Sequence, residues 1–250
     1  SNVQYFYDRG IRYITLTHAK DNLICDSSYD TTGTWGGLSP FGRKVVKEMN
    51  RVGIMVDISH VTDEVINQVL DMTDVPVIAS HSSCRHFTPG WERNMGDEEI
   101  KRLKENGGVI QINYGSSFIT QASLEKGEEN RERIMAYAKE NNLKRGDEVL
   151  TTFAKKINAK NPVYADISDV VDHFDRVVAL AGIDHVGIGS DYDGVGDSLP
   201  YGLKDVASYP NLIFHLLKRG YSEEDIEKIC YKNIWRVWSA VEKAAASQAG

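Results

Sequence analysis

Three histidines and an aspartate each stand at the end of a short apolar run. The four runs end in Leu-Thr-His18, Ile-Ser-His60, Ala-Ser-His81 and Gly-Ser-Asp191. A single histidine at a strand end is more often a hydrogen-bonded structural residue than a ligand. Burying three histidines and a carboxylate at equivalent positions would require a polar partner for each, so the recurrence indicates a shared functional site.

The residue types indicate which chemistry such a site could perform. His60 and His81, as neutral imidazoles on neighbouring strands, suit zinc or a similar borderline metal. Asp191 could deprotonate a metal-bound water and deliver the proton to a leaving amine. His18 has no neighbour that suggests a metal, and could donate a hydrogen bond to a developing oxyanion. The remaining histidines lack this setting and are expected to be structural or surface residues: His86, His173, His185 and His215.

The elements that must position these residues can be read from the apolar periodicity. Five runs rich in Val, Ile or Tyr predict buried strands. Helical patterns alternate with them and begin at Ser39-Pro40, Thr62, Asp97 and Ser168, whereas residues 121–162 look helical and solvated. This alternation predicts an α/β fold with a parallel sheet, either doubly wound or a (β/α)8 barrel, although a barrel should show eight strands. The predicted strands are Arg12–Thr17, Ile54–Ser59, Val75–Ser80, Gly108–Tyr114 and His185–Asp191.

Composition narrows the class of protein further. The 250 residues carry a formal charge of −7 with scattered Lys and Arg, so a nucleic-acid-binding face is not expected. No apolar window is long enough for a membrane span. Cys25, Cys84 and Cys230 match neither a disulfide framework nor a CxxC metal pattern. We therefore expect free thiols in a reducing compartment and a cytoplasmic location.

Several motifs, in order along the chain, resemble those of the membrane (renal) dipeptidase family of metal-dependent, amidohydrolase-type peptidases. The resemblance runs from about residue 4 to Val241. Its motifs are RYITLTH at 12–18, GLSPFGR at 37–43, VDISHV at 56–61, IASHSS at 78–83, Arg93-Asn94, GIGSDYDG at 187–194, GLKDV at 202–206 and YPNL at 209–212.

The resemblance implies a TIM-barrel fold, two zinc ions per complete site, and hydrolysis of dipeptides by a metal-bound hydroxide that attacks the peptide carbonyl. His60 and His81 would bind one metal, and His18 would hold the scissile carbonyl oxygen. Arg93 would bind the substrate carboxylate with its forked guanidinium. Asp191 would be the general acid and base.

The sequence departs from the family pattern in one respect. Family members carry a His-x-Asp pair on the first strand and a bridging glutamate on the third, whereas the only His-x-Asp here, His173 to Asp175, lies in a helical pattern. The five strands would then be strands four to eight of a single catalytic barrel domain over residues 1–250 that lacks its first three strands. We expect one zinc or none in this chain, and association with an N-terminal segment or a second copy.

Two other functions remain open from the sequence. Loss of half of the metal ligands would suit a non-catalytic binding protein that retains the mouth of the barrel. A related amidohydrolase acting on another amide is also possible, but Arg93 argues against it because this residue matches a free carboxylate.

Overall fold

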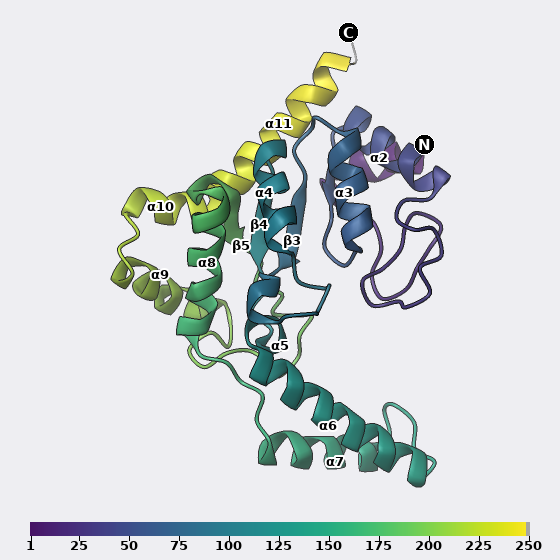
Figure 1. Ribbon diagram of the computed structural model, residues 1–250, viewed down its shortest axis with the longest axis vertical. Coiled ribbons are helices and arrows are strands. Elements are labelled where there is room, and N and C mark those ends of the chain that lie inside the picture. Colours follow the sequence, from purple (N-terminus) through teal and green to yellow (C-terminus); the bar gives the residue numbers. More distant parts are fainter. Residues whose placement is uncertain (249–250) are drawn as a thin grey trace.

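The computed structural model describes residues 1–248 and contains one parallel sheet whose five strands follow chain order (Figure 1). All five predicted strands are present, with shorter cores than the apolar runs suggested. The bounds are β1 Tyr13–Thr15, β2 Met55–Asp57, β3 Ile78–Ser82, β4 Val109–Ile112 and β5 Val186–Ile188. The sheet is not closed into a barrel: in the described part of the chain, β1 pairs only with β2, and β5 only with β4.

Four helices between the strands cover one face of the sheet (Figure 1). They are α2 Pro40–Val52, α3 Asp63–Met72, α4 Asp97–Asn106 and α8 Ile167–Ala181. The predicted starts of α2 and α3 are confirmed, because the side chains of Ser39 and Thr62 accept hydrogen bonds from Gly42 N and Val65 N. Helix α8 begins slightly before Ser168, because Asp166 and Asp169 form a capping box there.

The remaining helices lie around this unit. The short ones are α1 Asn2–Tyr7, α5 Ser116–Ile119, α9 Tyr209–Lys218, α10 Glu223–Glu227 and a π-helical turn at Lys228–Lys232, followed by the long α11 Asn233–Gln248; the 3₁₀ turns are Arg85–Phe87, Ile183–His185 and Val206–Ser208. Helices α6 Gln121–Glu140 and α7 Glu148–Lys160 form a hairpin that projects away from the sheet (Figure 1). No residue of α7 is buried, as expected for a solvated segment.

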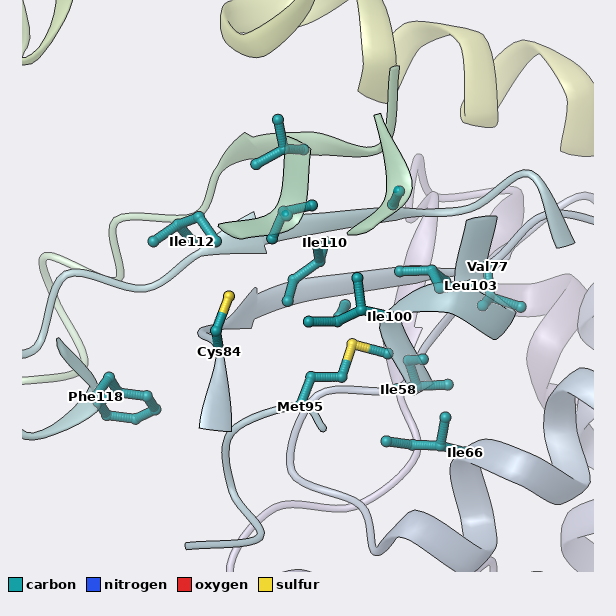
Figure 2. Packing of buried hydrophobic residues seen from close by; sticks show 14 of the residues in the cluster. Ile58, Ile66, Val77, Cys84, Met95, Ile100, Leu103, Ile110, Ile112 and Phe118 are labelled. Atoms are coloured by element: carbon teal, nitrogen blue, oxygen red, sulfur yellow. The ribbon is translucent and has the colours of Figure 1, made fainter. Parts of the chain in front are cut away.

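The core lies between the sheet and its covering helices. Ile110 of β4 lies beside Ile100 of α4, and Ile112, Leu103 and Ile58 belong to the same cluster (Figure 2). Side chains alternate between the two faces of a strand. Val109 therefore faces the opposite side, where it packs in a second cluster with Val237 and Val241 of α11.

The second face of the sheet is only partly covered. Beside α11 this face contains a cleft of about 650 Å³, which is lined in part by Tyr13, Thr15, Ser80 and Gln111. Tyr13 is 51% exposed. Apolar side chains, among them Met55 and Ile78, line the same cleft, so the strands present both polar and apolar side chains to an open space. Among residues 1–248, no helix combines the length and apolar character that crossing a membrane requires. The three cysteines are free thiols, as expected.

His173, expected to be structural, is fully buried on α8. Its Nδ1 accepts a hydrogen bond from Cys84 N at 3.0 Å, and its Nε2 lies 3.0 Å from the carbonyl oxygen of Ile119. With Nδ1 an acceptor, Nε2 carries the proton and donates. The histidine thus joins α8 to α5 and to the segment that follows β3, which carries Arg93.

This histidine predicts a pH-dependent stability. Burial lowers the pKa of His173 to about 4, against the opposing effect of its bond to Ile119. In the unfolded chain the pKa is about 6.5, so below that pH the unfolded state takes up a proton that the folded state refuses. The free energy of unfolding should therefore fall as the pH drops, by about 2 kcal/mol between pH 7 and pH 5 from this residue. Urea unfolding of the wild type and of His173→Gln at both pH values measures the difference, and equal losses in the two proteins would contradict it.

Candidate active site

The carboxyl ends of the five strands bring the predicted polar residues to one edge of the sheet. His18 follows β1, His60 follows β2, His81 lies within β3, and Asp191 follows β5. Asn113 follows β4 and is fully buried, and because β4 lies between β3 and β5 it stands between His81 and Asp191. The expected positions at the strand ends need a correction, because β3 extends through His81, whereas β1, β2 and β5 end two or more residues before His18, His60 and Asp191.

His60 and His81 face each other. Their Nε2 atoms are 2.8 Å apart, and the ring centroid of His18 is 4.4 Å from that of His60. Burial lowers the pKa of His60 to about 2, and the positive charge of Arg93 adds to the effect. The pKa of His81 is lowered by the same two causes. Both imidazoles are therefore neutral at physiological pH, which is the form that binds metals.

A chain of hydrogen bonds behind His81 determines which ring nitrogen carries its proton. Ser80 Oγ donates to Asp57 Oδ2 at 2.6 Å and lies 2.6 Å from His81 Nδ1. Because the hydroxyl has only one proton and the carboxylate accepts it, His81 Nδ1–H must donate to Ser80. The lone pair of His81 is then on Nε2, which faces His60. Such partners orient metal-binding histidines in known sites.

Asp57 was not predicted to be a site residue, although its position within an apolar run could have indicated it. It is fully buried inside an apolar run, and its carboxylate also accepts from Thr15 Oγ1, Ser59 N and Ser80 N. A buried carboxylate is costly unless it is hydrogen-bonded. A lone aspartate within the apolar run Ile54–Ser59 could therefore have marked a positioning role.

Asp191 is held in an unusual backbone conformation. Its φ is 57° and that of His60 is 72°, in the left-handed region that residues other than glycine rarely adopt. Such conformations concentrate at functional sites. Asp191 Oδ2 accepts a hydrogen bond from Asn113 Nδ2 at 2.9 Å. A Cβ on Gly194 would lie 2.1 Å from Asp191 Oδ1, so this glycine makes room for the carboxylate.

Arg93 is a buried cation that forms no ion pair within the described part of the chain. It is 2% exposed, and it donates to Ser82 Oγ at 3.0 Å and to the carbonyl oxygen of His81 at 2.8 Å. Among residues 1–248 its Nε–H has no hydrogen-bond partner, and the nearest negative charges that act on it are those of Asp57 and Asp191. Burial lowers the pKa of Arg93. Since an unpaired buried charge is destabilising, this side chain is suited to an anion supplied by a ligand.

The described residues supply part of a metal site. Within 1–248, no group of three or more His, Cys, Asp or Glu side chains is arranged to hold a metal ion. Two nitrogens bound to one zinc at about 2.0–2.1 Å each lie no more than about 4 Å apart. The 2.8 Å separation of the Nε2 atoms of His60 and His81 meets this limit. The pair therefore fits as two ligands of a metal.

The parallel sheet and its polar carboxyl edge define a class of α/β proteins whose site is built at the strand ends. Within that class, the model of the membrane dipeptidase family (Peptidase family M19) matches residues 1–250. Dipeptidase tcpJ of Claviceps purpurea (strain 20.1) is 38% identical over 250 residues, which are 100% of this chain and 49% of that protein. An uncharacterized dipeptidase of Schizosaccharomyces pombe is 36% identical over 246 residues, 97% of this chain and 50% of that protein. The chain belongs to the membrane dipeptidase family, and it spans about half the length of these curated relatives.

Solved structures share the fold. The probable dipeptidase PvdM from Pseudomonas aeruginosa has a TM-score of 0.81 and 28% identity, over 98% of this chain and 66% of that one. A metallopeptidase from Rhodobacter sphaeroides, liganded with a phosphinate mimic of L-Ala-D-Ala, has a TM-score of 0.74 and 24% identity, over 96% of this chain and 59% of that one. The α/β architecture with a parallel sheet is therefore shared with both of these structures.

Proposed function

We propose that the protein is a zinc-dependent dipeptidase whose substrate lies across the carboxyl edge of the sheet. His60 and His81 would be metal ligands, Asp191 the general acid and base, and His18 a donor to the scissile carbonyl oxygen. Arg93 would hold the substrate carboxylate. The observation that carries the proposal is the pair of neutral imidazoles, with Nε2 atoms 2.8 Å apart, at the edge that also holds Asp191.

A zinc ion held by His60 and His81 would polarise the peptide carbonyl and lower the pKa of a water molecule. The protein's own groups provide the rest. Asp57 and Ser80 keep the lone pair of His81 on Nε2. Asn113 binds one oxygen of Asp191, and among the described residues nothing donates to the other, Oδ1. That oxygen can accept a proton from water and transfer it to the amine that leaves.

We further propose that β1 to β5 are five consecutive strands of a (β/α)8 barrel that forms a single catalytic domain. The open second face supports this, because Thr15 and Ser80 line a cleft there and the edges of β1 and β5 are unpaired in the described part of the chain. Exposed strand edges and apolar side chains such as Tyr13 favour pairing with further polypeptide, from this protein or from a second copy.

The test is dipeptide hydrolysis by the full-length protein before and after metal removal. L-Ala-L-Ala should be cleaved, a chelator should abolish turnover, and added zinc should restore it. His60→Ala should lower the zinc content measured by mass spectrometry, because it removes one of the two proposed ligands. His215→Ala, on α9 outside the site, is the matched control and should leave both zinc content and turnover unchanged.

Two outcomes would overturn the proposal. Turnover that persists in protein shown to be free of metal would exclude the metal-dependent mechanism. Tight binding of the dipeptide without hydrolysis, in zinc-loaded protein, would instead identify a non-catalytic binding protein. Only two metal ligands are recognised among residues 1–248, which is the observation that favours this second candidate.

A further inference from the structure

A hollow of about 420 Å³ lies beside the site, between the loop that carries Tyr29, the turn at Trp91, and helices α5 and α6. Its apolar wall is formed by Tyr29, Trp91, Phe118 and Leu124. Arg131 is exposed and lies at its solvent side. The hollow is therefore apolar inside and polar at its mouth, which is the usual character of a small-molecule pocket.

The aromatic wall is continuous with the residues proposed to hold the substrate. The Tyr29 ring centroid is 5.8 Å from that of His60 and 6.3 Å from that of Trp91. The centroids of Trp91 and Phe118 are 4.8 Å apart, and the guanidinium carbon of Arg93 lies 5.0 Å from the Phe118 centroid. The wall thus begins at the histidine pair and ends at the buried arginine.

We propose that this hollow receives the side chain of the carboxyl-terminal residue of the dipeptide and favours apolar and aromatic side chains. The inference rests on the proposed function, because it requires Arg93 to hold the substrate carboxylate. A carboxylate bound at Arg93 would lie near Phe118, whose ring centroid is 5.0 Å from the guanidinium carbon. The side chain of the same residue would then lie near Trp91, whose ring packs against Phe118. Burial of apolar surface against these rings, at about 25 cal/mol per Å², supplies the preference.

Gly127 keeps the hollow open. It lies within the twenty-residue helix α6, where glycine makes a helix less stable than alanine does. Gly127 lines the hollow, and a Cβ built there would meet no atom within 4 Å. A larger side chain at this position can be accommodated by the helix, and it would occupy the space that we assign to the substrate side chain.

The experiment compares Gly127→Leu with the wild type on L-Ala-L-Phe and L-Ala-Gly in the full-length protein. We expect kcat/KM for L-Ala-L-Phe to fall on the order of 10 to 100-fold, mainly through KM, because the variant removes binding space from a part of the substrate that does not react. L-Ala-Gly, which has no side chain at that position, should change by less than about 2-fold. The kcat/KM of Gly127→Ala for L-Ala-L-Phe should lie between the values of the wild type and Gly127→Leu.

Two controls separate this inference from the fold and from the proposed function. Ala122→Leu introduces the same side chain at an exposed position of α6 outside the hollow, and it should change kcat/KM for neither dipeptide. The melting temperature of Gly127→Leu should equal or exceed that of the wild type. Equal effects on the two dipeptides, or none, would overturn the inference. If the wild type cleaves neither dipeptide, the proposed function fails. The pocket can then be tested separately by calorimetry: Gly127→Leu should raise the Kd of L-Ala-L-Phe and leave that of L-Ala-Gly unchanged.

Discussion

Replacing Asp191 by asparagine is expected to lower kcat by a factor of about 10² to 10⁴, which is the typical contribution of a positioned acid or base. Asparagine can still accept the hydrogen bond from Asn113, so the side chain should keep its place, but it can no longer take up and release a proton. KM should therefore change little. Steady-state kinetics on L-Ala-L-Ala, with zinc content measured in parallel, provides the test.

The neighbouring Asp193 supplies a matched control. It is exposed on the same loop, so Asp193→Asn changes the charge by the same amount without touching the proposed proton transfer. A loss of turnover as large in Asp193→Asn as in Asp191→Asn would show that net charge near the site matters and that Asp191 has no special role. Near-normal kcat in Asp191→Asn at full zinc content would remove Asp191 from the mechanism.

Replacing Arg93 by alanine should raise KM by a factor of about 30 or more, because loss of one partner of a buried charged hydrogen bond costs about 2 kcal/mol or more. Arg93 also donates to Ser82 and to the backbone of His81, so its removal could disturb the site as well as the substrate. A matched pair of substrates separates the two effects. The wild type should strongly prefer L-Ala-L-Ala over its C-terminal amide, and Arg93→Ala should lose that preference.

Arg93→Lys tests the geometry of the same contact. Lysine keeps the charge but offers a single ammonium in place of a planar fork, so only part of the preference for the free carboxylate should return. Arg133→Ala, on the exposed surface of α6, is the control and should behave as the wild type. An unchanged preference for the carboxylate in Arg93→Ala would show that another group binds it.

Local patterns in the sequence were sufficient to predict the strands, the main helices and their order along the chain. The five apolar runs became β1 to β5 of a parallel sheet, and Ser39 and Thr62 begin the helices that they were expected to begin. These features depend on side-chain periodicity and on hydrogen bonds between residues a few positions apart, which one chain segment contains by itself. The family, too, was recognised from short motifs in their order and is confirmed by the match over residues 1–250.

The contacts within the site could be decided only by the tertiary structure. His60 and His81 were expected to be neighbours, but the 2.8 Å approach of their Nε2 atoms depends on how β2 and β3 pair. The support of His81 by Asp57 and the burial of an unpaired Arg93 were not foreseen. The hollow at Gly127 exists because α6 crosses beside a turn that is distant in sequence. Periodicity says which side of an element is apolar, whereas the distance between side chains on different elements is set by packing of the whole chain.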